Sequence, residues 1–365
     1  MNIMLNNVLL ANLIFISVFF IIIIFSIKKK DNFDLLSITV TQELKGLAIL
    51  GVIFCHIGYF LSINHNFLFP LSIISGISVD LFLFLSGFGL TMSSLKKEIS
   101  ISKFYKKNLI KLYIPFLISI IILFLLNFFF VHIDYSLSYI IKSLTGVFTT
   151  ADIFRDINSP LWYFTFIVFY YLIFPLVFSK KKPWFSAIII FIITFLITGL
   201  KLNIINGVSF LYNVHIMAFP IGIIFANIFS NTKITEMIKN NISKISKFLH
   251  ILLSIGLLTI FLLLAYFLGV SREIFVEQTI SILAMLSLIV FFIIKKFNIN
   301  IFYILGLYSY EIYLIHWPIM YHYDFLYKYT PAWLATLLYI VIFLGLGYLL
   351  KKFSDYIIKT FFIKQ

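Results

Sequence analysis

Four ionisable side chains interrupt apolar stretches of the sequence: His56, Asp80, Glu311 and His316. Within hydrocarbon each such group costs about 2.5–3.5 kcal/mol or more unless the protein shelters it, so these positions are candidates for chemistry. An imidazole exchanges a proton near neutral pH, and a neighbouring carboxylate can orient it. The pattern predicts proton transfer inside an apolar structure. The alternative is that each histidine only makes a hydrogen bond to a neighbouring helix.

Lys45 and His56 are spaced so that one helix would present both on the same face. Eleven residues correspond to three helical turns plus about 20°, and to about 16 Å along the axis. This spacing predicts a polar path, with Lys45 at its cytoplasmic mouth and His56 near the middle of the membrane. Gly46 and Gly51 would allow a neighbouring helix to pack closely.

Asp80 lies at a similar predicted depth in the next apolar segment, so we predict a His56–Asp80 pair in which the carboxylate holds one tautomer of the imidazole. Asp80 could instead bond to backbone or to a lysine. Ser86 lies nearer the cytoplasm, beside Gly87, where a glycine could let the backbone approach a ligand.

A lysine cluster, Lys103, Lys106, Lys107 and Lys111, precedes another apolar run. Such a cluster suits a phosphate-rich ligand such as the diphosphate of coenzyme A, and it equally suits anionic lipid headgroups. In residues 300–318 we place Glu311 at mid-depth and His316 near the outer surface, where His316 could also be a plain interfacial residue.

These residues need helices that cross a membrane. Hydrophobic residues make up 62% of the chain and charged residues only 12%, against about a quarter charged in soluble domains. Apolar runs of about 17–22 residues predict an all-α, polytopic transmembrane bundle with about eleven spans. The predicted spans are 8–27, 44–62, 71–93, 110–131, 161–178, 184–201, 210–230, 248–269, 278–294, 300–318 and 331–350.

The distribution of charge predicts the orientation. If alternate connections are cytoplasmic, that side holds 23 of the 28 basic residues, which places the amino terminus outside and the carboxyl terminus inside. Because the lysines bracket apolar segments, the net charge of +14 does not indicate nucleic-acid binding. One cysteine excludes an intramolecular disulfide and a cysteine metal cluster.

Four segments in order resemble the acyltransferase-3 family of membrane proteins: Lys45 to His56, Val79 to Phe88, the basic helix ending at Pro115, and Tyr308 to Pro318. The segment beginning Leu161-Trp162 is also similar to a family motif. The resemblance implies a ten-span domain over 43–350, preceded by an additional helix and linker in 1–42 and followed by a basic cytoplasmic tail in 351–365.

The resemblance also implies a donor and site residues. Acyl-CoA, most simply acetyl-CoA, would bind from the cytoplasm without a metal. His56 carries over as the essential histidine, with Lys45 as its basic partner. Lys106 and Lys107 stand where the family usually has two arginines, and lysine lacks the bidentate guanidinium fork. Ile167 and Val168 stand where many members have a glutamate pair, so any role of that acid is absent or passes to Glu311.

By this resemblance the protein is a bacterial plasma-membrane O-acyltransferase acting on a cell-surface or lipid-linked glycan, in contact with membrane lipid and possible glycan-assembly machinery. Ser86, Trp162, Glu311 and His316 are candidate substrate-binding residues, and Lys111 joins the donor-binding lysines. His56 would act as general base or carry the acyl group. The rival interpretations are a glycan transporter or exporter and a non-catalytic scaffold.

Overall fold

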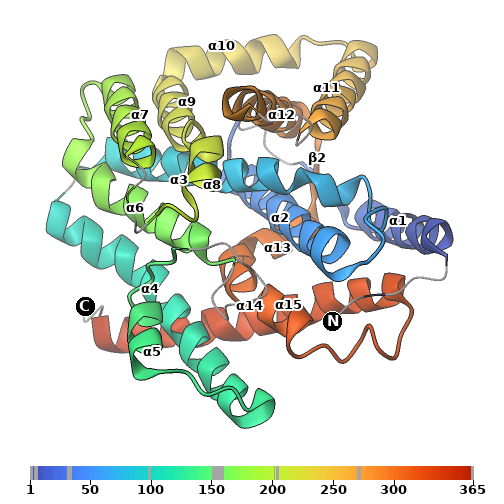
Figure 1. Ribbon diagram of the computed structural model, residues 1–365. Helices are drawn as coiled ribbons and strands as arrows, with labels where there is room; N and C mark the ends of the chain where they lie inside the picture. The colour runs from blue at the N-terminus through green and yellow to red at the C-terminus, as the bar shows by residue number, and fades with distance from the viewer. Residues whose placement is uncertain are drawn as a thin grey trace.

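The computed structural model describes residues 3, 7–30, 35–97, 100–149, 160–200, 202, 205–268 and 273–362. These residues form a helical bundle with one short pair of strands (Figure 1). In chain order the elements are α1 Val8–Phe25, β1 Ile27–Lys29, α2 Ile38–Cys55, the π-helical η1 His56–Leu61, the 3-10 η2 Leu71–Ile74, α3 Ser75–Lys96, α4 Ile101–Leu126, the π-helical η3 Asn127–Val131, α5 Leu137–Leu144, α6 Trp162–Val177, α7 Pro183–Gly199, α8 Ser209–His215, α9 Ala218–Ser230, α10 Thr232–Ser243, α11 Lys247–Phe267, α12 Ile274–Ile294, β2 Phe297–Ile299, α13 Asn300–Leu307, α14 Ser309–Tyr321, α15 Ala332–Ile357 and the π-helical η4 Ile358–Phe362.

Eight helices of the described residues are long and apolar enough to cross a membrane, and α6 and α7 are shorter apolar helices. The protein is therefore a multi-pass membrane protein, as the composition predicted. The prediction of one continuous span over 300–318 is wrong. Tyr308 has φ −118° and ψ 10°, outside the α-helical range, and this residue separates α13 from α14.

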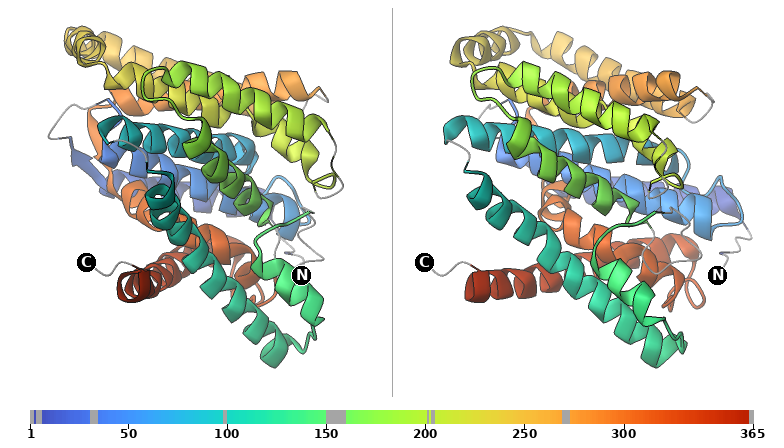
Figure 2. Two further views of the ribbon diagram at one scale, coloured as in Figure 1. Left: turned by 90° about the vertical axis from the view of Figure 1, so that its left-hand side faces the viewer. Right: turned by 60° about the vertical axis from the view of Figure 1, so that its left-hand side comes forward.

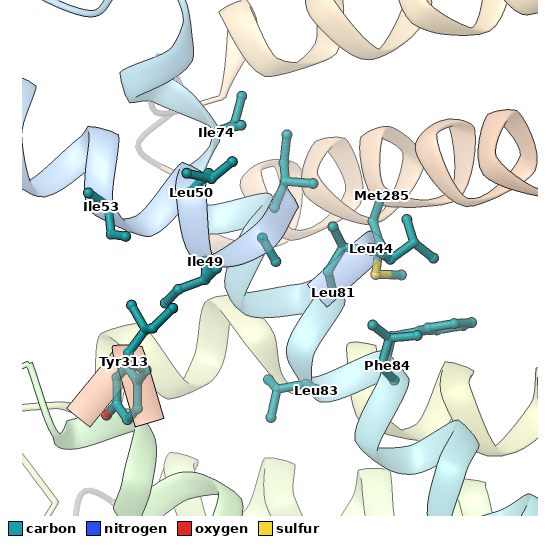
Figure 3. Close-up of a cluster of buried hydrophobic side chains, with 14 of the residues drawn as sticks. Leu44, Ile49, Leu50, Ile53, Ile74, Leu81, Leu83, Phe84, Met285 and Tyr313 are labelled. Atoms are coloured by element: carbon teal, nitrogen blue, oxygen red, sulfur yellow. The ribbon is translucent and has the colours of Figure 1, made fainter. Parts of the chain in front are cut away.

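Helices α2 and α3 lie in the middle of the bundle, with α9 to α12 above them and α13 to α15 below in the view of Figure 1. Figure 3 shows the apolar contact at this centre. Leu44 of α2 lies beside Leu81 of α3, Leu50 of α2 lies beside Ile74 of η2, and all four side chains are buried. Lipid tails are as apolar as these residues, so close packing rather than exclusion from water stabilises the contact.

Glycines allow the tightest helix crossings. A Cβ atom at Gly46 of α2 would overlap the carbonyl oxygen of Phe302 in α13, and one at Gly306 would overlap the carbonyl oxygen of Gln42. The two backbones are therefore in direct contact, which confirms the predicted close packing at Gly46. The crossing places the residues after Gly306, where α14 begins, beside the first half of α2.

Gly87 of α3 also packs directly against the backbone of a neighbouring helix. A Cβ there would overlap the carbonyl oxygen of Phe219 in α9. The expectation that this glycine lets backbone approach a ligand is therefore wrong, because the space is taken by a neighbouring helix.

The strands β1 and β2 form an antiparallel pair that joins the end of α1 to the start of α13. Beside it, the Lys295 ammonium donates to Glu43 of α2 at 2.8 Å and to the carbonyl oxygen of Phe297 at 2.6 Å. The second Glu43 oxygen accepts from the backbone N–H of Ile299. Burial lowers the pKa of the Lys295 ammonium, and the Glu43 carboxylate opposes that shift. This ion pair fastens the strands to α2.

Helices α4 and α15 cross on the lower side of the bundle in both views of Figure 2. The expected tail beyond residue 350 is helical, because α15 continues to Ile357 and η4 to Phe362. Lys351 consequently stands on a rigid helix.

Candidate active site

Four of the predicted site residues meet in one cavity of about 300 Å³. Lys45 comes from α2, Ser86 from α3, Lys111 from α4 and Glu311 from α14. We call this space the inner cavity. Its polar wall is formed by Gln42, Lys45, Ser86, Lys111, Ser309, Glu311 and Lys351.

The wall of the inner cavity carries more positive than negative charge. Lys45, Lys111 and Lys351 face one carboxylate, Glu311, whose oxygen lies 3.7 Å from the Lys351 ammonium. Lys351 also lies 3.8 Å from Asp355, one turn along α15. An excess of ammonium groups attracts a ligand with several negative charges.

The sequence suggested that Glu311 lies in the middle of a span, and the structure places it elsewhere. It lies in the first turn of α14 and is level with Lys351, which is two turns before the end of α15. The break at Tyr308 restarts the helix there, so Glu311 faces the lysines of the cavity.

Four tyrosines also line the cavity: Tyr163 and Tyr171 from α6, and Tyr310 and Tyr313 from α14. The Tyr310 hydroxyl donates to the carbonyl oxygen of Leu112 at 2.6 Å, and that of Tyr313 donates to Pro160 at 3.1 Å. Each ring is thus held in place. Such walls suit a ligand that has both apolar and polar parts.

Sequence reasoning missed Gln42, Tyr171 and Lys351 as cavity residues. One signal was present for α6. Tyr163, Ile167 and Tyr171 are four residues apart, so they share one helix face, and all three line the cavity. Ile167, which replaces an acid of the family motif, therefore faces the same space as Glu311.

His56 and His316 form a direct pair. Nδ1 of His56 lies 2.8 Å from Nε2 of His316, and the two rings are parallel within 4°. His56 is the first residue of η1, directly after α2, and is 8% exposed; His316 is fully buried. Trp317 packs edge-on against His56.

The surroundings of His316 determine which nitrogens carry protons. Nδ1 of His316 lies 2.9 Å from the carbonyl oxygen of Tyr313 and 3.2 Å from that of Ile312. Carbonyl oxygens only accept, so Nδ1 of His316 must donate, and Nε2 of the neutral ring accepts. The proton between the rings then belongs to Nδ1 of His56. Nε2 of His56 therefore holds a lone pair and can act as a base.

The predicted His56–Asp80 pair is wrong in this structure. The Asp80 carboxylate accepts from Nδ1 of His215 at 2.8 Å and from the Ser281 hydroxyl. Both donors come from other helices, α8 and α12, that pack against α3. A buried carboxylate is stable only with such donors, and here they tie three helices together. His316 takes the orienting position beside His56 that was expected of Asp80.

The remaining predicted residues lie outside the inner cavity wall. Lys106 and Lys107 are exposed on α4, and among the described residues only Lys111 of that cluster lines the cavity. Trp162 stacks on His215 with ring centroids 6.1 Å apart. These positions leave the predicted roles of Lys106, Lys107 and Trp162 as hypotheses.

Tyr313 connects the cavity with the histidine pair. Its ring lines the inner cavity, and the centre of the ring is 6.4 Å from that of His316. His56 and His316 themselves are not among the described residues that line the cavity. Within the described chain, no group of three or more His, Cys, Asp or Glu residues is arranged to hold a metal ion.

The structure is thus that of a helical membrane protein with a cationic cavity and a buried histidine pair. Residues 44–352 match the family model described as an acyltransferase domain, that of acyltransferase-3 proteins. Because the match covers most of the chain, the protein belongs to the acyltransferase-3 family and has acyltransferase activity. The family resemblance found from the motifs is confirmed. Comparisons with curated proteins and with solved structures give no match.

Proposed function

We propose that the protein moves an acyl group, in the simplest case acetyl, from acyl-CoA to a hydroxyl of a cell-surface or lipid-linked glycan. The observation that carries this proposal is the pairing of His56 with His316, which leaves Nε2 of His56 unprotonated. Transfer to a hydroxyl needs a base at that step, and an imidazole lone pair supplies it.

In this proposal acyl-CoA binds at the end of the bundle where Lys45, Lys111 and Lys351 meet. The ammonium groups attract the anionic donor, and the thioester arm passes between Ser86 and the tyrosines of the inner cavity. Lys106 and Lys107, one to two turns before Lys111 on α4, attract the donor to this mouth. Glu311 supplies the acid that Ile167 and Val168 do not.

Every proton and bond in the proposed transfer step can be accounted for. Nε2 of His56 takes the proton of the acceptor hydroxyl, and the oxygen attacks the thioester carbonyl. The C–S bond then breaks, and the CoA thiolate takes the proton back from the imidazolium. Transfer through an acyl-histidine would use the same lone pair. In both routes the thioester must pass Tyr313, a cavity-lining residue whose ring centre is 6.4 Å from that of His316.

The distribution of lysines supports the orientation of this reaction. We place the inner cavity on the cytoplasmic side of the plasma membrane, with the amino terminus outside. Residues 43–350 hold the reaction site together with Lys351, and α1 is an addition fastened by the β1–β2 pair.

The proposal predicts that surface glycans from cells with the protein carry acyl esters that cells without it lack, as measured by mass spectrometry. Purified protein in vesicles should also release CoA from labelled acetyl-CoA only when a glycan acceptor is present. Unchanged glycans, or saccharide flux across the vesicle without CoA release, would contradict the proposal.

His316→Ala is expected to lower kcat by about 10–100-fold, because the His56 ring loses the group that holds its tautomer and orientation. His316→Gln should recover most of the activity, since its amide oxygen can accept from Nδ1 of His56. The KM for acetyl-CoA should stay the same in both variants. A purely structural role for His316 predicts instead that stability falls and that glutamine rescues no better than alanine.

A further inference from the structure

A second cavity, of about 420 Å³, lies against one face of α15 and η4. It shares Leu307 and Lys351 with the inner cavity, so the two spaces are neighbours. We call the second space the α15 groove. Neither the family motifs nor the proposed function accounts for it.

The groove follows a stripe along one helix face. Tyr348, Lys352, Asp355 and Lys359 are spaced by four, three and four residues, which places them on one side of the helix over about 16 Å. With Lys351, the stripe carries three ammonium groups and one carboxylate. The carboxylate of Asp355 lies 3.8 Å from Lys351, so a net positive charge remains along Lys352 and Lys359.

Aromatic rings lie at the end of the groove nearest the inner cavity. Tyr308, at the break between α13 and α14, packs edge-on against Tyr348 with ring centroids 5.9 Å apart. The Lys352 ammonium is 5.9 Å from the centre of the Tyr348 ring. Tyr348 is 46% exposed, so part of its surface is available to a planar ligand. Aromatic rings beside ammonium groups suit a base that carries phosphates.

We propose that the α15 groove binds the nucleotide half of acyl-CoA. The adenine packs against Tyr348, Lys352 and Lys359 contact the phosphates, and the pantetheine arm passes Lys351 into the inner cavity. The inference rests on the proposed function, since it assigns a place to the donor of that reaction. It assigns the phosphates to α15 rather than to Lys106 and Lys107, which are exposed on α4 and line neither this groove nor the inner cavity among the described residues.

An anionic lipid headgroup shares the phosphate chemistry of a nucleotide, so the test must separate the two sources. The full chain is placed in nanodiscs of zwitterionic lipid, and dissociation constants are measured for CoA and for acetyl-pantetheine, which lacks the nucleotide. Wild-type protein should bind CoA more tightly than acetyl-pantetheine. The double variant Lys352→Ala, Lys359→Ala should lose about tenfold or more in CoA affinity and nothing in acetyl-pantetheine affinity.

The matched control replaces Lys233 of α10 and Lys244, the residue directly after that helix, in the double variant Lys233→Ala, Lys244→Ala, which should leave both affinities unchanged. Thermal unfolding checks that each variant folds. Full CoA preference in the α15 double variant overturns the inference while the proposed function stands. The same holds if Lys106→Ala with Lys107→Ala abolishes the preference instead, or if the α15 lysines matter only in discs of anionic lipid. If wild-type protein binds no CoA, the proposed function itself fails.

Discussion

His56→Ala is expected to lower acyl transfer by about 10²–10⁴-fold, the usual contribution of a positioned general base. The variant loses the imidazole that acts as the base. In the wild type, the hydrogen bond of this ring to His316 leaves its Nε2 unprotonated. The measurement is CoA release from acetyl-CoA by purified protein, together with the acyl content of surface glycans in cells that express the variant.

A second substitution separates chemistry from packing. The side-chain amide of His56→Asn can still donate to Nε2 of His316, so the bond between α2 and α14 remains, yet an amide is no base. This variant should fold normally and be as inactive as the alanine variant. His250, also buried, bonds to the carbonyl oxygen of Ile294 at 2.7 Å and provides the matched control. His250→Ala should affect stability more than turnover. Turnover near the wild-type rate in His56→Asn would refute the assignment of the base.

Glu43→Ala is expected to destabilise the protein by about 3–5 kcal/mol, the usual cost of breaking a buried ion pair from one side. The variant leaves the Lys295 ammonium, which is 1% exposed, with no carboxylate beside it. It also leaves the backbone N–H of Ile299 without its acceptor. The midpoint of thermal unfolding in detergent should fall clearly below that of wild-type protein.

Two comparisons make this test specific. Glu236 is exposed on α10, and Glu236→Ala should leave the midpoint unchanged. The double variant Glu43→Leu, Lys295→Met removes both charges and should be more stable than Glu43→Ala alone, because no unpaired charge stays buried. A midpoint for Glu43→Ala equal to that of the wild type would show that the pair does not hold the strands to α2.

Much of the architecture could be predicted from local patterns. A run of apolar residues long enough to cross hydrocarbon must form a helix, because only intrahelical hydrogen bonds satisfy the backbone there. This rule located the long apolar helices without any knowledge of their neighbours. It failed over 300–318, where hydropathy alone gave no sign of the break at Tyr308.

Local sequence patterns also predicted part of the site. Gly46 was expected to pack closely, and it does. Lys45, Ser86, Lys111 and Glu311 were singled out one by one, and they line one cavity. Glu311 was conspicuous because an ionisable group in an apolar helix is costly without a partner or a ligand, whereas Lys45 was noted for its spacing from His56 and Lys111 for its place in a lysine cluster.

By itself, the sequence determined that the chain is a membrane bundle and that it resembles the acyltransferase-3 family, and it singled out His56 as a candidate base. Only the tertiary structure decided that His56 pairs with His316, 260 residues away, and that Asp80 pairs with His215. The physical reason is that helix periodicity determines which face a side chain occupies. Which side chain it meets depends on how separate helices pack, and glycine contacts such as those of Gly46 and Gly306 set that packing.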